Sequence, residues 1–490
     1  MTSYSYLSML AQSRQAWPAL MAGVLLSGCA SLSSDGGNAV INRLTQDRLA
    51  QPIQFIRSDN EQQTLTEQVN QLLTSPLTLD HALQIALTNN RGLQAIYAQV
   101  GIAEADWVQA TRLANPGLSF SRTRRADELL IDRTFSLNLI NFLVTPLASK
   151  IEQQRFEQVK LLVSQEALQV AAATRKAWFE AVAAEQTVLY TKQVGSAVEA
   201  STELARNMTK VGNWSKRDQL REESFLAEAN VLITRSQANA ISSREKLARL
   251  LGLNSAQSHY TLPERLPDLP EQALLADDLE QLAMQQRLDI QAAQKEREGL
   301  VRALGLTKAT RLINVLELGY VRNSETNRAA EKGYEIRLEV PLFDWGGARV
   351  ARAEGRYMQS LHQLADTALR AQSEVRESYQ LYQGQYALAK HYRDTVVPLR
   401  KQIADENLLR YNGMLISVFE LLADAREQIN STTAYLDALK GYWLAEADLQ
   451  QALGGKLPST ANAAVTAPRP SVPEAAQPEV PHATPRGAQP

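Results

Sequence analysis

The feature that most constrains the fold is a long stretch without helix breakers. Between Leu147 and Val211 there is no proline and one glycine, Gly195, and between Asn213 and Leu251 there is neither. An α-helix rises about 1.5 Å per residue, so the first stretch alone would be about 100 Å long. Because this exceeds the diameter of a small domain, we predict an elongated molecule built from long helices. Aromatic residues make up only 6% of the 490, which suits thin helical packing.

The chain also carries an internal repeat. Three groups of landmarks recur in one order, about 200 residues apart, which is too long for a solenoid unit. They are Leu93-Gln94-Ala95 with Ile290-Gln291-Ala292, Val211-Gly212-Asn213 with Asn412-Gly413-Met414, and Leu250-Leu251-Gly252-Leu253 with Ala452-Leu453-Gly454-Gly455. We therefore predict a tandem duplication, with a first repeat over 76–255 and a second over 256–455.

Both repeats follow one predicted plan: a helical stretch, two strands, a very long helix, a tight turn and a returning helix. The opening stretches are expected over Leu79–Leu113 and Asp277–Lys308, and the second long helix over Ala348–Asn412. Pro398 lies at nearly the place of Gly195, so both are expected to mark a kink at the same level.

Apolar residues recur every seven positions in the returning helices. The pattern predicts coiled-coil packing against neighbouring helices. It comprises Leu226, Ile233, Ala240 and Leu247, flanked by Ala227, Thr234, Ile241 and Ala248, and, in the second repeat, Leu422, Ile429, Leu436 and Trp443. An ordinary helical bundle or a plain coiled-coil rod would show the same periodicity.

Four short segments alternate apolar and polar residues, as a two-faced β-strand does. They contain Leu118–Phe120, Phe135–Leu139, Leu316–Tyr320 and Tyr334–Val340. Outer-membrane barrel strands have this pattern. No segment has the roughly 20 apolar residues of a membrane-spanning helix.

Four strands cannot close such a barrel, because a single chain needs at least about eight. An open sheet in lipid would leave backbone groups without partners. If these strands enter a membrane, several copies must share one barrel, and three copies would supply about twelve strands. The alternative is a four-stranded sheet packed on the helices in water.

The start of the chain reads as an export signal. Arg14 precedes an apolar run, Ala16–Leu26, and then Leu26-Ser27-Gly28-Cys29. This predicts a signal peptide over 1–28. The four residues resemble a bacterial lipobox, which implies acylation of Cys29 (palmitate) and, with Ala30 next, an outer-membrane lipoprotein. A secreted protein with a stray cysteine is the alternative.

Residues 29–75 are expected to form an extended lipidated leader, and the proline-rich 456–490 a disordered tail.

At about residues 77–455 the chain resembles the TolC-like outer-membrane factor family. Val340-Pro341-Leu342-Phe343-Asp344-Trp345-Gly346-Gly347 resembles the strand-to-helix junction of that family. Pro341 would end strand pairing, and Gly346 and Gly347 would permit a sharp turn. The segments from Val211 to Asp218 and from Tyr411 to Leu422 resemble the tips of its helical hairpins, where a glycine in each is expected to supply the left-handed residue that reverses the chain.

The resemblance implies a mixed α+β chain, mostly of long helices, whose four strands join a 12-stranded trimeric β-barrel continued by a periplasmic α-helical barrel. It implies a passive exit duct of a tripartite efflux system. The partners would be two further copies in a homotrimer, a periplasmic adaptor (membrane fusion protein), an inner-membrane efflux pump and outer-membrane lipid. A non-conducting periplasmic coiled-coil lipoprotein tether is the alternative function.

The predicted tips contain the candidate site residues. Ser215 and Ser417 are expected N-caps, with Asp218 and Glu420 at capping-box spacing. Capping alone would explain these acids. The family match implies in addition that Asp218, Glu420 and Asp424 line the periplasmic mouth and pair with Lys216 or Arg217. It also implies that the adaptor docks at the tips, on Gly212, Trp214, Ser215, Gly413, Leu415 and Ser417.

Other function classes find little support. The net charge of −2 gives no basic surface for nucleic acid. The sequence shows no phosphate-binding loop, no metal-ligand cluster and no nucleophile motif, and its five histidines are scattered. We therefore predict no enzyme activity, cofactor or metal site.

Overall fold

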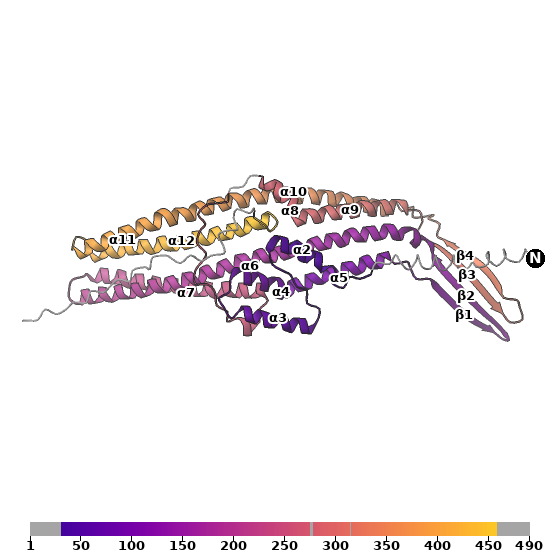
Figure 1. The fold of residues 1–490 in the computed structure, drawn as a ribbon, viewed down its shortest axis with the longest axis horizontal. Coiled ribbons are helices and arrows are strands. Elements are labelled where there is room, and N and C mark those ends of the chain that lie inside the picture. The colour runs from indigo at the N-terminus through magenta and orange to yellow at the C-terminus, as the bar shows by residue number, and fades with distance from the viewer. Residues whose placement is uncertain (1–30, 275–277, 314, 458–490) are drawn as a thin grey trace, which may run out of the picture.

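Figure 1 shows the computed structural model, which describes residues 31–274, 278–313 and 315–457. The molecule is long and thin, with a small sheet at one end and the tips of two helical hairpins at the other. Helix α6 (Leu139–Lys210) has 72 residues and runs from the sheet to a tip. At about 1.5 Å per residue it is about 108 Å long, so the predicted elongation is confirmed. Within the described residues, no helix has the length and apolar character needed to cross a membrane.

The predicted duplication is confirmed by the order of the elements. The first half comprises α4 (Leu79–Asn89), α5 (Arg91–Thr111), β1 (Gly117–Arg125), β2 (Glu128–Asn138), α6 and α7 (Lys216–Leu251). The second half comprises α8 (Leu279–Gln286), α9 (Leu288–Ala309), β3 (Leu316–Glu325), β4 (Glu331–Leu338), α10 (Gly347–His391), a π-helical turn (Tyr392–Val396), α11 (Val397–Asn412) and α12 (Val418–Ala452). Each predicted opening stretch is two helices, because Asn90 and Arg287 adopt extended backbone between them.

The boundaries of α6 differ from the prediction. The helix begins at Leu139 rather than Leu147, because the Asn138 side chain caps it by accepting from the Asn141 N–H at 3.3 Å. Gly195 does not interrupt α6, which continues through it. A Cβ at Gly195 would lie 2.6 Å from Ile233 Cδ1, so this glycine allows α7 to approach closely. Only the second half has the irregularity, as the π-helical turn just before Pro398.

The predicted extended leader is also wrong in its described part. It contains α2 (Asn38–Leu49) and α3 (Asp59–Leu72), which lie along the middle of the molecule. Ile41, Leu65 and Val69 are buried against the body, and the Ser58 side chain caps α3. Burial of these apolar side chains explains why the segment folds onto the long helices. Residues 29–30, with Cys29, lie outside the described part.

The core is concentrated where the two halves meet, near the middle of the long helices. Phe179 of α6 stacks on Trp443 of α12, with ring centroids 5.1 Å apart. The Trp443 indole N–H donates to the carbonyl oxygen of Pro267, in the segment that links the repeats. The side chains of Leu266 and Leu269 are buried, so that segment packs across the helices. The two halves are therefore held together as one body at this level.

The coiled-coil seam of α7 is confirmed only in part. Ala240, Leu247 and Ala248 are buried, as predicted, but Ala227, Thr234 and Ile241 are exposed. The positions that face α6 instead are Glu222, Ala229 and Ser236. Together with Leu226 and Ile233 they alternate at spacings of three and four residues, as the seam of a coiled coil does. The polar members of this set concealed it in the sequence.

Candidate functional site

The four strands form one antiparallel sheet in the order β1-β2-β3-β4. The register places Leu118, Phe135, Tyr320 and Tyr334 in one row across it, on one face. Leu118 is 81% exposed and Tyr334 82% exposed, so this apolar face has no covering layer within the described chain. Within the described residues, the outer edges of β1 and β4 have no neighbouring strand. The unpaired backbone N–H and C=O groups of such edges can pair with a strand of another chain.

The opposite face of the sheet is polar. Arg337 of β4 pairs with Glu317 of β3 at 3.0 Å and with Glu335 at 3.3 Å. Small hydroxyl side chains, such as Ser119 and Thr134, lie side by side on the same face. The predicted alternation is therefore confirmed, and the sheet has one apolar and one polar face.

The junction between β4 and α10 agrees with the prediction for two of three residues. Pro341 follows the end of the β4 ladder. Gly346 is left-handed (φ 74) and forms the N-cap of α10, where a Cβ would lie 2.6 Å from the carbonyl oxygen of Arg311. Gly347 is simply the first residue of the helix, and a Cβ there would meet nothing within 4 Å. Gly346 alone therefore makes the turn.

At the first hairpin tip, Gly212 is left-handed (φ 79), as expected. Ser215 caps α7: its Oγ accepts from the Asp218 N–H at 3.2 Å and donates to Asp218 Oδ2 at 2.6 Å. The Ser215 hydroxyl, helped by Arg217 and Arg221, lowers the pKa of Asp218. Arg217 Nε lies 3.6 Å from Asp218 Oδ1, whereas Lys216 forms no ion pair with Asp218 in the described structure.

At the second tip, the expected role of Gly413 is wrong. Gly413 has φ −79, and the left-handed residue is Met414 (φ 57). The Met414 N–H donates to Tyr411 O and the Leu415 N–H to Arg410 O, the same pair of bonds that Gly212 and Asn213 make at the first tip. Position 414 lies as far beyond 212 as Ser417 lies beyond Ser215 and Gly454 beyond Gly252. The structural counterpart of Gly212 is therefore Met414.

This geometry makes Met414 a point of backbone strain. A left-handed conformation costs a residue with a Cβ about 1–2 kcal/mol. We expect Met414→Gly to raise the stability of the α11–α12 hairpin by about 1 kcal/mol, measured as slower hydrogen exchange of the tip amides. Gly413→Ala is the control: because a φ of −79 suits a residue with a Cβ, it relieves no left-handed strain and is expected to slow the exchange only by the smaller amount, about 0.5 kcal/mol, that restricting the unfolded chain gives. Equal effects of the two substitutions would contradict this assignment.

The other predicted acids also have partners within the chain. Ser417 and Glu420 form a capping box, in which Glu420 Oε2 accepts from the Ser417 N–H at 3.0 Å. Asp424 accepts from the Asn407 side chain on the facing helix α11. Leu415 is 77% exposed and Trp214 half-buried. The capping roles of Ser215 and Ser417 are confirmed, while the roles in closure and docking stay predictions.

A buried ion pair near the tips was missed by the sequence analysis. Arg426 of α12 donates to Glu222 Oε1 of α7 at 2.7 Å, and the Glu222 side chain is only 1% exposed. The Arg426 guanidinium also lies 4.0 Å from the centre of the Phe225 ring. This pair joins the hairpin of the first half to that of the second, one turn beyond Asp218. The seven-residue spacing from Glu222 to Ala229 was the signal that could have found it.

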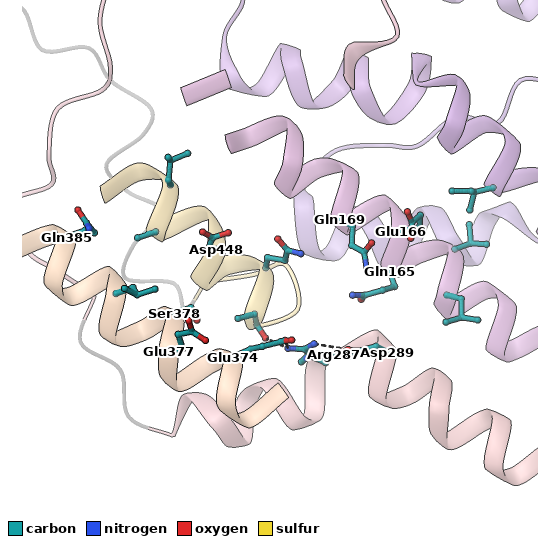
Figure 2. Close-up of a pocket in the computed structure, with 18 of the residues that line it drawn as sticks. Gln165, Glu166, Gln169, Arg287, Asp289, Glu374, Glu377, Ser378, Gln385 and Asp448 are labelled. Carbon is teal, nitrogen blue, oxygen red and sulfur yellow. Dashed lines mark hydrogen bonds and ion pairs between the residues drawn. The ribbon is translucent and has the colours of Figure 1, made fainter. Parts of the chain in front are cut away.

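A large groove of about 1040 Å³ lies between the halves, between α6 and the pair α10 and α12. Figure 2 shows its lining, which is rich in carboxylate and amide side chains. Arg287 is buried in its wall and donates to Asp289 at 2.7 Å and to Glu374 at 2.6 Å. Burial lowers the pKa of Arg287, but these hydrogen bonds outweigh it and raise the pKa above its ordinary value. The described residues contain no cluster of side chains that could hold a metal ion.

Known proteins match this chain in structure but not in sequence. No protein-family profile matches the chain, and no curated protein matches its sequence. Solved structures do match. The outer-membrane channel OprN is 18% identical with a TM-score of 0.65, over 79% of this chain and 92% of OprN. The CmeC outer-membrane channel of Campylobacter jejuni is 16% identical with a TM-score of 0.63, over 84% of this chain and 91% of CmeC. The open MtrE outer-membrane channel of Neisseria gonorrhoeae is 19% identical with a TM-score of 0.61, over 77% of this chain and 89% of MtrE.

The chain has a TolC-like channel fold. The predicted fold class, mostly long helices with a small four-stranded sheet, is confirmed. The matched proteins are channels rather than enzymes. Because the TolC-like fold is shared at under 20% identity, conduction, assembly and membrane location are taken up below as proposals.

Proposed function

We propose that this protein is a passive outer-membrane exit duct. Three copies join their sheets into one 12-stranded β-barrel, and their long helices continue the duct into the periplasm. The observation that carries the proposal is the two-faced sheet with both edges open. Its apolar face is exposed and its opposite face polar, as lipid and a water-filled lumen require.

The edges of the sheet support closure by identical copies. The sheet has an even number of strands, all antiparallel, so β1 and β4 run in opposite directions. Joining β4 of one copy to β1 of the next therefore continues the antiparallel ladder and satisfies the backbone groups that lipid would leave without partners. The exposed apolar side chains on α7, such as Val231 and Ile241, are surfaces that neighbouring helices would cover.

The hairpin tips support a role in a larger assembly. Val211, Met414 and Leu415 are apolar and strongly exposed at the end farthest from the sheet. We propose that a periplasmic adaptor binds here, and that it links the duct to an inner-membrane efflux pump. An energised pump would then drive small molecules or ions through a conduit that has no energy source of its own. Anchoring by an acylated Cys29 is part of the same proposal.

The decisive experiment measures single-channel conductance in planar bilayers together with the mass of the purified protein in detergent. A conducting species with the mass of three chains is expected. A non-conducting monomer would reject the duct and favour the coiled-coil tether. Measuring both quantities on one preparation separates failure of assembly from failure of conduction.

The acidic tip residues make a further prediction for the proposed duct. If Asp218, Glu420 and Asp424 narrow the mouth, replacing all three with alanine is expected to raise the open-channel conductance severalfold and to weaken cation selectivity. Ser215→Ala with Ser417→Ala is the matched control, because it removes the caps and keeps the acids. An increase in the control as large as in the triple variant would assign these acids to capping alone.

A further inference from the structure

The acidic residues of the four strands all lie on one face of the sheet. On the face that carries Leu118, Tyr320 and Tyr334, the register places five charged residues within the strands, and all five are basic. They are Arg122, Arg124, Arg133, Arg322 and Lys332. The opposite face carries the acids of the strands, including Asp132, Glu317 and Glu335. This separation is not required by the fold, since either sign would be soluble on an exposed strand.

The basic residues also occupy one end of their face. The row next to Tyr320 and Tyr334, toward the hairpin loops, pairs Arg133 with Arg322 and Arg322 with Lys332. All three side chains are exposed. Arg133 donates to the Ser324 hydroxyl at 3.3 Å, which holds it on this face. Across the described residues none of the three has an acidic partner within 4 Å, so the row presents uncompensated positive charge. Like charges in one row repel each other, so an anion in front of them would be stabilising.

The basic row lies at the end of the apolar face nearest the hairpin loops. From Lys332 to Leu338, the last residue of β4, the chain advances about 20 Å, at about 3.4 Å per residue. A strand tilt of roughly 40° reduces this to about 16 Å, which is the larger part of the apolar band of roughly 25 Å on a barrel. The exposed apolar residues Leu342, Phe343 and Trp345 follow β4 at its other end, away from the hairpin loops. The basic row thus lies where the hydrocarbon would end on the side of the hairpin loops.

We propose that Arg133, Arg322 and Lys332 bind the phosphate groups of anionic lipids in the outer leaflet. The inference rests on the proposed duct, because only in that arrangement does this face meet lipid. Guanidinium and ammonium groups are the side chains that recognise phosphate, and a side chain at the end of an apolar face reaches the head-group level without desolvating its charge. The absence of acids from this face, within the described strands, is the complementary condition for an anionic surface.

The test uses lipid A, a phosphorylated glycolipid, as the probe and phosphatidylcholine as the neutral comparator. Binding to the purified assembly in detergent is followed by native mass spectrometry. The parent is expected to retain lipid A in preference to phosphatidylcholine. Each basic residue near a membrane surface contributes roughly a fivefold change in affinity, so Arg133→Gln, Arg322→Gln and Lys332→Gln together are expected to weaken lipid A binding about 100-fold. Binding of phosphatidylcholine is expected to be unchanged.

The matched control removes three positive charges from the same sheet and its loop without touching this row. It combines Arg125→Gln, Arg328→Gln and Arg337→Gln, and it is expected to bind lipid A like the parent. Equal loss in both triple variants would overturn the proposal in favour of net charge. Displacement of lipid A by inorganic phosphate at equal concentration would point to a free-anion site instead.

The parent alone gives a second, independent result. If the conducting trimer shows no preference for lipid A over phosphatidylcholine, the inference fails while the proposed duct stands. If no trimer or conductance is found, the proposed function fails first. Because the parent measurement does not depend on the variants, poor folding of a variant does not protect the proposal.

Discussion

Replacing Arg426 with leucine is expected to destabilise the protein by about 3–5 kcal/mol, because it leaves a buried carboxylate without its cation. Glu222 Oε1 accepts from Arg426 at 2.7 Å, and the only other side-chain donor to this carboxylate in the described structure is the Ser201 hydroxyl, at 3.4 Å. Ser201 cannot replace a charged partner at that distance. The measurement is the free energy of unfolding from urea denaturation, followed by circular dichroism.

A second variant separates the loss of charge pairing from the loss of packing. Glu222→Leu combined with Arg426→Leu removes both charges, and it is expected to recover most of the stability that Arg426→Leu loses. Arg410→Leu is the control, because Arg410 pairs with Glu406 at 3.2 Å on an exposed face of α11. Its effect is expected to be below about 0.5 kcal/mol. If the double variant is no more stable than Arg426→Leu, the contact of the Arg426 guanidinium with the Phe225 ring is the dominant contribution.

The second large effect concerns pH. Glu446 of α12 is buried at the junction of the two halves, and burial raises its pKa to about 7, although Arg175 of α6 opposes the shift. Its ordinary value is 4.5. The folded state therefore holds a proton that the unfolded state has released between these two pH values. Stability is expected to fall as the pH rises from 4.5 to about 7, by roughly 3 kcal/mol in all.

Glu446→Gln removes this titration while keeping the size of the side chain. The variant is expected to be more stable than the parent by roughly 3 kcal/mol at about pH 8, with the difference shrinking toward zero at about pH 4.5. Asp437→Asn is the matched control: Asp437 lies on the same helix, but it is exposed and pairs with Lys440 at 2.8 Å. Parallel stability curves for the parent and Glu446→Gln, over the whole pH range, would contradict the assignment.

Local sequence signals predicted the features that local chemistry determines. Ser215 and Ser417 each stand before an acid at capping-box spacing, and both are N-caps. The alternation through Leu118 and Tyr334 placed the strands and their faces, because a strand has a period of two whatever its neighbours. The duplication could be found because the two repeats retain similar landmark residues at nearly the same spacing.

Features that depend on tertiary packing were not accessible in the same way. Gly195 read as a kink, but the space it provides is used by Ile233 of another helix. Gly413 read as the reversal, because a glycine is the usual left-handed residue, yet the packing of the second tip places Met414 there. Glu222 was not singled out in the sequence, because its burial depends on a partner on a distant helix.

The described part of the leader shows the same limit. Ile41, Leu65 and Val69 are too few and too widely spaced to give a clear apolar stripe in the sequence. Their burial depends on the surface that α6 and its neighbours already provide. Cys29, whose acylation the sequence implies, lies outside the described residues, so that prediction is left to mass spectrometry of the mature N-terminus.

The long helix of the first half and its counterpart in the second half differ in continuity, and this has a mechanical consequence. Helix α6 is unbroken from the sheet to its tip, whereas the corresponding leg of the second half passes through a wide turn of helix at Tyr392–Val396. A continuous α-helix transmits a displacement over its whole length, whereas a helix interrupted by a π-helical turn bends most easily at that turn. If the end of the molecule with the hairpin tips widens, we therefore expect α11 and α12 to move outward while α6 and α7 keep their direction.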